Sequence, residues 1–132
     1  MAITELMFGL VLVNQRFIET YPRTPMLYDS GVLYRMEHGT EIWQDIPSLI
    51  MSRFGDCEDL ACWRAAELRV EGIDALPYIT WRKASDKSGT IYHALVRHPK
   101  GLIEDPSRAL GMRGHPIVKR PVYIDLDPFD GV

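Results

Sequence analysis

The sequence predicts an α+β fold in which a helix that carries a cysteine packs on an antiparallel β-sheet. Two patterns predict it: a helix with clear start and stop signals over residues 57–71, and period-two alternation of apolar residues after Gly72. The length of 132 residues and the apolar content of 46% suit a compact domain with its own core. We therefore expect a single domain over residues 1–132.

Two helices and one short strand are expected before this central helix. Residues 4–20 have apolar side chains at helical spacing and are followed by a proline, and residues 32–36 form a candidate strand. The apolar side chains of the first helix are Leu6, Leu10, Val13 and Phe17. Residues 41–51 predict a short helix, and Pro47 must then lie in its first turn or break it.

The central helix has the strongest local signals. Asp56 is a good N-cap, Asp59 can complete a capping box, and Gly72 suits the position just after the helix end. Helical spacing predicts one packed face of small side chains, with Cys57 at its N-terminal end. That face consists of Cys57, Ala61, Ala65 and Leu68.

Four strands are predicted after this helix. They cover residues 75–82, 90–97, 102–104 and 122–126. Turn residues at Lys83–Gly89 and Pro99–Gly101 separate the first three strands. Short connections of this kind predict an antiparallel meander.

Cys57 is a candidate nucleophile. A thiol attacks a carbonyl carbon as the thiolate, and the N-terminus of a helix favours negative charge. Asp56, Glu58 and Asp59 oppose ionisation because they are themselves negative, so a histidine partner is required. The alternative role for Cys57 is that of a small buried apolar residue. Its position at a helix start, directly after Gly55 and Asp56, favours the nucleophile.

His93 and Asp105 are the candidate partners of this thiol. His93 lies in the second predicted strand on one face with Ile91 and Leu95, where it could also be a core histidine. Asp105 follows the third strand, so its carboxylate could hold one ring nitrogen and leave the other for the thiol. The pattern predicts a triad of nucleophile, base and orienter at Cys57, His93 and Asp105.

Three segments together resemble the transglutaminase-like superfamily of papain-like cysteine enzymes: Gly55–Ala61, Tyr92–Ala94 and Glu104–Ser107. The family has the same order of cysteine, histidine and aspartate. The resemblance covers Phe54–Ser107, and the chain is similar to small members encoded by phages and prophages. It implies a papain-like core, with the cysteine at the start of a central helix and the other two residues on adjacent strands. The family often has tryptophan where this chain has Leu95, so we expect a different substrate groove.

The resemblance implies acyl transfer through a thioester. The thiol would attack an amide carbonyl, and the imidazolium would protonate the leaving amine. Water would then complete the reaction of a peptidase or amidase, whereas an amine acceptor would complete that of a protein-glutamine transglutaminase. We favour hydrolysis by analogy with small members of the family. The other alternative is a non-catalytic phage assembly or accessory module that kept the fold.

Two further residues are candidates for the site. The backbone N–H of Cys57 is expected to be the first oxyanion donor. Gln44 resembles the glutamine that precedes the cysteine in papain-like enzymes and could be the second donor, or it could be an exposed helix glutamine. Trp43 could form a wall of the substrate channel or belong to the core.

Charge and composition exclude several other classes of function. The net charge is −3, with 15 basic and 18 acidic residues well mixed, so neither nucleic acid nor a membrane is an expected partner. The expected partner is a peptide or amide substrate. The longest apolar run, residues 6–13, is too short for a membrane span and has no basic leader. We therefore expect no signal peptide. The expected location is the cytoplasm, which is that of the host if the chain is phage-encoded.

Neither a metal nor another cofactor is expected. Cys57 and Cys62 are five residues apart, so they point in different directions on a helix and do not face each other. Histidines and cysteines lack the paired spacing of zinc ligands. Two unpaired cysteines suit a reducing compartment.

Overall fold

The computed structural model describes residues 3–36, 42–83 and 90–125, and this part of the chain has the α+β class that the sequence predicts. The helices are α1 (Ile3–Thr20), α2 (Ile46–Ser52), α3 (Cys57–Val70) and α4 (Pro106–Ala109). The strands are β1 (Leu33–Tyr34), β2 (Phe54–Gly55), β3 (Leu76–Lys83), β4 (Thr90–Arg97), β5 (Ile103–Glu104) and β6 (Tyr123–Ile124). Single 3₁₀ turns lie at η1 (Leu27–Asp29), η2 (Pro99–Gly101) and η3 (Met112–Gly114).

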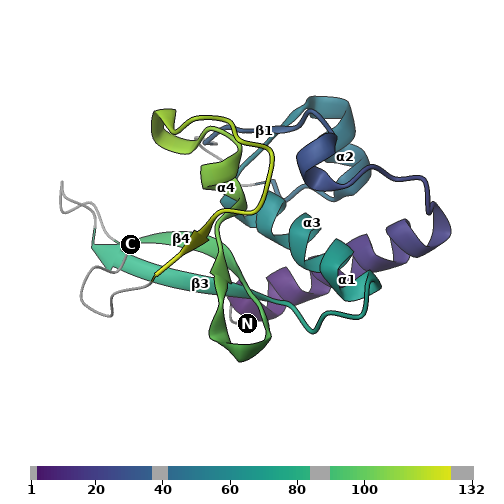
Figure 1. Ribbon diagram of the computed structural model, residues 1–132, viewed down its shortest axis with the longest axis horizontal. Helices are drawn as coiled ribbons and strands as arrows, with labels where there is room; N and C mark the ends of the chain where they lie inside the picture. Colours follow the sequence, from purple (N-terminus) through teal and green to yellow (C-terminus); the bar gives the residue numbers. More distant parts are fainter. Residues whose placement is uncertain (1–2, 37–41, 84–89, 126–132) are drawn as a thin grey trace.

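Helix α3 is the central element, with α1 along one side and α2 and α4 on the other (Figure 1). The predicted capping box is confirmed, because the Asp56 carboxylate accepts from the first turn and the Asp59 carboxylate accepts from the Asp56 N–H. Gly72 follows the helix end with φ of +90°, a conformation that favours glycine. Every residue from 57 to 68 is buried, as expected of a helix covered on all sides.

Strands β3 to β6 form an antiparallel sheet in sequence order, which confirms the predicted meander. β3 and β4 pair along their whole length. β4 and β5 pair only where Val96 and Arg97 face Glu104 and Ile103, because the chain leaves the sheet after Glu104 and enters α4. The edge of β4 before Val96 is therefore not covered by β5. The short helix α4 is not predicted by the sequence pattern.

A parallel pair formed by β1 and β2 leads the chain into α3. β1 lies inside the strand predicted over residues 32–36, but its pairing with β2 is not evident from the sequence. Gly55, the last residue of β2, has no room for a side chain. A Cβ there would lie 2.5 Å from Leu49 Cδ2 and 3.2 Å from Leu60 Cδ2. This close packing fixes the backbone two residues before Cys57.

The hydrophobic core lies on both sides of α3. The cluster toward α1 and the sheet includes Met7, Val11, Cys57, Ala61, Ala65, Ala94 and Val96. The cluster toward α2 and α4 includes Leu27, Ile46, Leu49, Leu60, Trp63 and Leu110. Small side chains on the first face of α3 let neighbouring backbones approach closely, and the predicted small-residue face is confirmed.

Two details of the first helices differ from expectation. α1 buries Met7, Val11 and Asn14, whereas Leu6 and Val13 of the predicted face are 48% and 54% exposed. Apolar residues occur nearly all round this helix, so spacing alone does not select the buried face. The Asn14 side chain is buried because its Oδ1 accepts the Ile46 N–H at 3.0 Å.

Helix α2 begins at Ile46, later than predicted. The Asp45 carboxylate caps it by accepting the Ser48 N–H, and Pro47 lies in its first turn as required. Residue 41 and residues 84–89 of the predicted hairpin loop lie outside the described residues. No helix of the described part of the chain is long and apolar enough to cross a membrane.

Candidate active site

His93 and Asp105 form a buried hydrogen-bonded pair. His93 Nε2 lies 3.0 Å from Asp105 Oδ2, and the two residues are 7% and 3% exposed. The second carboxylate oxygen, Oδ1, accepts the Arg108 N–H at the start of α4, which fixes the orientation of the carboxylate. Because Nε2 faces the carboxylate, Nδ1 is the ring nitrogen left to serve a thiol. Two of the three predicted residues are therefore in direct contact.

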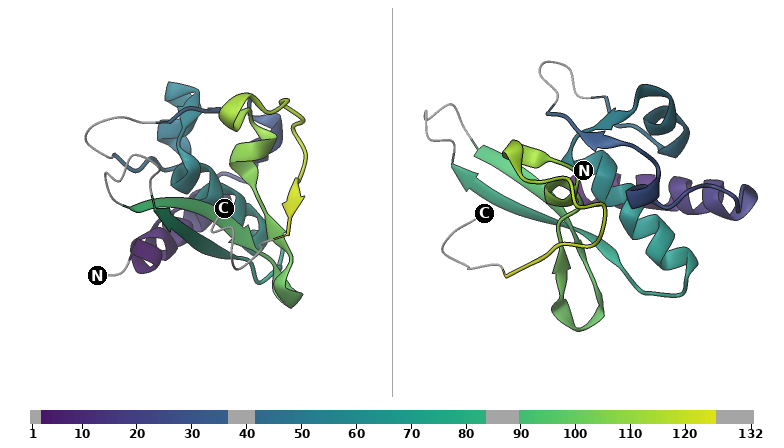
Figure 2. Two further views of the ribbon diagram at one scale, coloured as in Figure 1. Left: turned by 90° about the vertical axis from the view of Figure 1, so that its left-hand side faces the viewer. Right: turned by 45° about the horizontal axis from the view of Figure 1, so that its top comes forward.

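Cys57 lies beside the strand that carries this histidine. The backbone N–H of Ala94, the residue after His93, is directed at the Cys57 sulfur. Backbone N–H groups of a strand point along the sheet toward its neighbours, and β3 occupies the other edge of β4. The sulfur therefore lies along the edge of β4 that β5 leaves open. Figure 2 shows the long hairpin of β3 and β4 from two further sides.

The thiol itself faces a carboxylate rather than the imidazole. Cys57 Sγ donates to Glu58 Oε2 at 3.3 Å, and no hydrogen bond joins thiol and imidazole among the described residues. Glu58 is only 2% exposed although it can carry a charge. Its place beside the sulfur is not predicted by the sequence pattern, which indicated only its negative charge. The only signal available was its position next to the cysteine in the first turn of the helix.

Burial raises the pKa of the Cys57 thiol well above its usual value. The Glu58 carboxylate adds to this effect, and the Ala94 N–H opposes it. Burial also raises the pKa of Glu58 to about 8, and the nearby Asp56 contributes. Burial, together with the acidic neighbours, therefore favours the neutral form of the thiol at rest.

The expected oxyanion donors already have partners. The Cys57 N–H donates to Asp56 Oδ1 at 2.7 Å. Gln44 is 8% exposed and precedes α2, so the alternative of an exposed helix glutamine is wrong. Its Nε2 donates to the Phe54 carbonyl at 2.9 Å, and its backbone N–H donates to Asp59 Oδ1 at 2.8 Å. The structure thus brings Gln44 to the first turn of α3, with its amide engaged by neighbouring backbone.

Three half-buried aromatic residues pack against the cluster that contains Cys57: Tyr34, Trp43 and Tyr92. Trp43 packs against the core, as one of its two predicted roles requires, and its role as a wall of a substrate channel stays a prediction. Tyr34 and Tyr92 were not singled out from the sequence, although Tyr92 directly precedes the candidate histidine. Tyr92 also contacts Trp81, with ring centroids 5.5 Å apart. These three aromatic side chains therefore belong to the partly exposed rim of the cluster that contains Cys57.

The ligand atoms of Asp56, Cys57 and Glu58 lie within 4.8 Å of one another and could hold a metal ion. Zinc takes four ligands in structural sites and three protein ligands in catalytic ones. Here the Asp56 and Glu58 carboxylates each accept a hydrogen bond from Cys57. These hydrogen bonds explain why the three ligand atoms lie close together. The second cysteine, Cys62, is fully buried and donates to the Met7 carbonyl at 3.4 Å; both thiols are free.

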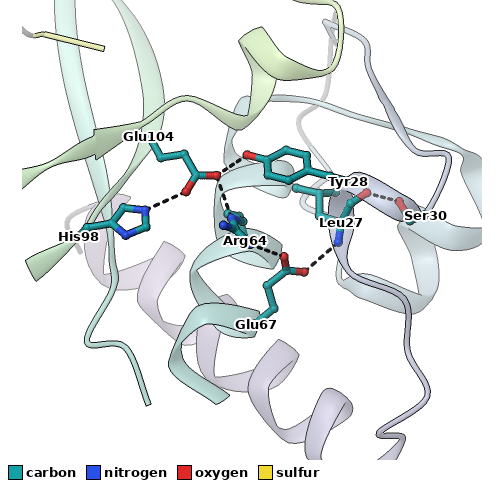
Figure 3. A network of polar contacts seen from close by, with 7 residues as sticks. All are labelled: Leu27, Tyr28, Ser30, Arg64, Glu67, His98 and Glu104. Atoms are coloured by element: carbon teal, nitrogen blue, oxygen red, sulfur yellow. Dashed lines mark hydrogen bonds and ion pairs between the residues drawn. The ribbon is translucent and has the colours of Figure 1, made fainter. Parts of the chain in front are cut away.

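A second cluster of buried polar residues lies farther along α3 (Figure 3). The Glu104 carboxylate accepts from Tyr28 Oη and from Arg64 Nε, the latter at 2.8 Å, and contacts His98 Nε2 at 2.8 Å. Arg64 Nη1 donates to Glu67 Oε2 at 2.8 Å. The sequence pattern did not reveal this cluster, because its members come from four separate segments. Its one local signal is the position of Glu104 next to Asp105.

A pocket of about 360 Å³ lies elsewhere, lined by Tyr78, Arg97, Ile103 and Ile124 among others. It contains no member of the predicted triad. The reactive thiol, imidazole and carboxylate lie instead at Cys57, His93 and Asp105. Comparisons with protein-family models, with curated proteins and with solved structures found no match for this chain.

Proposed function

We propose that this chain is a cysteine-dependent acyl-transfer enzyme of the transglutaminase-like type, acting as a peptidase or amidase. The observation that supports the proposal is the buried contact of 3.0 Å between His93 and Asp105, beside the strand edge at which the Cys57 thiol lies. A carboxylate on one ring nitrogen orients the imidazole and stabilises its protonated form. The remaining nitrogen can then take a proton from a thiol.

The reaction begins with transfer of the Cys57 thiol proton to His93 Nδ1. The sulfur then forms a bond to the carbonyl carbon of an amide, and the carbonyl oxygen takes the negative charge. His93 returns the proton to the departing nitrogen as the C–N bond breaks, which leaves a thioester. Water attacks the thioester with His93 again acting as base, and the products are a carboxylic acid and the free thiol.

Because the resting thiol is neutral, the imidazole acts as a general base during attack. This differs from a preformed pair of thiolate and imidazolium. The proposal also requires the thiol to turn from the Glu58 carboxylate toward His93 by rotation about the Cα–Cβ bond of Cys57. Substrate that occupies the site would favour this rotation by replacing the Glu58 contact. The proposal therefore includes a resting state and an active rotamer.

Alkylation by iodoacetamide tests the proposal without a known substrate. We expect Cys57 to react much faster than Cys62 near neutral pH, as measured by mass spectrometry of the labelled peptides. Exposure alone could favour Cys57, which is 6% exposed against 0% for Cys62. The decisive variant is therefore His93→Ala, which removes the base and, as a truncation, does not reduce access to Cys57. Equal labelling of Cys57 in the wild type and in His93→Ala would refute the proposed base.

A screen with peptides, peptidoglycan fragments and amine acceptors tests the reaction itself. Hydrolysis that is lost in Cys57→Ala and His93→Ala supports a peptidase or amidase. Incorporation of an amine into a glutamine-containing protein would instead assign the transglutaminase alternative. His115→Ala is a suitable control, because this histidine is not part of the site. His93→Ala should lower turnover by about 10²- to 10⁴-fold, the usual contribution of a general base.

A non-catalytic module that kept the fold is the second candidate. The observation that favours it is the hydrogen bond of the thiol to Glu58, together with the raised pKa of Cys57. This candidate predicts slow labelling of both cysteines and no effect of His93→Ala. The alkylation experiment thus separates the two candidates directly.

A further inference from the structure

Glu104 is a buried carboxylate that the proposed reaction does not use. It is 0% exposed, and three side chains from three other segments contact it: Tyr28, Arg64 and His98 (Figure 3). A buried carboxylate is costly unless it is paired and hydrogen-bonded. The three side chains therefore constrain the position of Glu104 closely, and with it the end of β5.

The next residue along the chain is the orienter of the proposed triad. Glu104 pairs with Val96 across the sheet and points toward α3, where Arg64 holds it. Asp105 follows, and its N–H donates to the Val122 carbonyl at 2.8 Å. Successive residues of a strand point to opposite sides, so a side chain held toward α3 directs the next one away from it, toward His93.

The same helix holds both ends of the site. Cys57 and Arg64 are seven residues apart on α3, which is two helical turns or about 10 Å along the axis. Through Arg64 and Glu104, the helix that carries the thiol is thus joined to the strand end that carries Asp105. Glu67 supports Arg64 from the other side at 2.8 Å and accepts the Leu27 N–H at 2.8 Å, which ties η1 to the same cluster.

We infer that the ion pair of Arg64 and Glu104 is a positioning device, which holds Asp105 against His93 and sets both relative to Cys57. The inference rests on the proposed function where it gives Asp105 a role in catalysis. The contact between Asp105 and His93 can be measured whether or not the chain is an enzyme. Arg64 and Glu104 touch no reacting atom, so they are positioning residues. They act through Asp105.

The double variant Arg64→Met with Glu104→Gln tests the inference. It removes both charges together and retains similar side-chain volumes, an exchange that buried pairs often tolerate. The matched control is Arg69→Met, which removes an ion pair of the same helix to Asp74, a side chain that is 83% exposed. Thermal unfolding of each variant shows whether the fold is retained.

The first measurement is the NMR signal of the His93 Nε2 proton. We expect a downfield signal in the wild type, since the proton is shared with a buried carboxylate, and we expect its loss in Asp105→Ala and in the double variant. Arg69→Met should retain it. A folded double variant with an unchanged signal would overturn the inference, whether or not the chain is an enzyme.

The second measurement is the pH dependence of Cys57 alkylation. In the double variant we expect the rate at neutral pH to fall about tenfold toward that of His93→Ala, with Arg69→Met at the wild-type rate. If the double variant does not fold, Arg64→Lys replaces it, because lysine keeps the charge but not the fixed geometry of the guanidinium. Arg64→Lys should then show an intermediate rate and a weakened signal; wild-type values for both would overturn the inference. Failure of the proposed function is distinct, because it would appear as equal rates in the wild type and His93→Ala.

Discussion

The thiol of Cys57 donates a hydrogen bond to the carboxylate of Glu58 across 3.3 Å, with both side chains buried. Two groups this close titrate as a pair, since a negative charge on one disfavours ionisation of the other. Burial raises the pKa of each group, and the negative charge of Glu58 raises the pKa of the thiol further, whereas the hydrogen bond from the thiol lowers the pKa of Glu58. Glu58 therefore restrains the thiol in its neutral form.

Glu58→Gln should make Cys57 more reactive. Above the raised pKa of Glu58, about 8, the carboxylate is charged and opposes ionisation of the thiol; the amide removes that charge, so the alkylation rate at about pH 9 should increase by about tenfold, equal to about one pKa unit. The rise of rate with pH should begin at a correspondingly lower pH. Glu67→Gln is the control, because it neutralises another buried carboxylate of α3 that does not contact the thiol. An unchanged pH profile in Glu58→Gln would show that Glu58 does not control the thiol.

Asp105→Asn should impair the reaction more than the fold. Asparagine can still accept the Arg108 N–H and cap α4, but it cannot stabilise a protonated His93. Turnover should fall at least about a hundredfold, since the orienter of such a triad is required for the correct tautomer. The melting temperature should stay close to that of the wild type. Asp105→Ala loses the cap as well, so its unfolding free energy should be about 1 kcal/mol lower than that of Asp105→Asn. Wild-type turnover in Asp105→Asn would remove Asp105 from the triad.

Gly55→Ala should destabilise the fold around the thiol. The new methyl group would lie 2.5 Å from Leu49 Cδ2, so side chains or backbone must shift, at a cost of about 1–3 kcal/mol. Denaturation in urea measures this cost. Gly9→Ala is the control: its Cβ meets no atom within 4 Å, and alanine in the middle of α1 should stabilise the chain by about 1 kcal/mol. Stabilisation by both substitutions would contradict the close packing at Gly55.

The raised pKa of Glu58 should make stability depend on pH. The folded chain binds this proton more tightly than the unfolded chain, in which the pKa is 4.5. Stability from this group is complete below pH 4.5 and is lost as the pH rises toward about 8, the folded value. The unfolding free energy of the wild type should thus fall relative to Glu58→Gln between pH 5 and pH 8. A constant difference between the two proteins over this range would show that the pKa is not raised.

The elements that the sequence predicted well depend on short-range signals. Helix α3 begins and ends where Asp56, Asp59 and Gly72 predict, because capping groups lie within a few residues of the atoms that they satisfy. The β3 and β4 hairpin follows from alternation and from a short connection. The face of α1 was predicted incorrectly because Leu6 and Val13 are as apolar as the residues that the core selects.

Other features depend on contacts between distant segments. The contact of Glu104 with Tyr28 joins residues that are 76 positions apart, and its contact with Arg64 joins residues that are 40 positions apart. The pairing of β1 with β2 likewise joins separate segments, since Leu33 faces Phe54. No local pattern encodes such partners. Gln44 shows the same limit, since its burial depends on Phe54 and Asp59.

The sequence by itself determined the α+β class, the helix that begins at Cys57, and the order of thiol, imidazole and carboxylate along the chain, since local capping, periodicity and residue chemistry are sufficient for these. The pairing of His93 with Asp105 was predicted from their places on neighbouring strands, whereas tertiary structure alone decided that the thiol faces Glu58 at rest. Hydrogen bonds and Coulomb interactions act over a few ångströms, so they depend on which groups folding brings together.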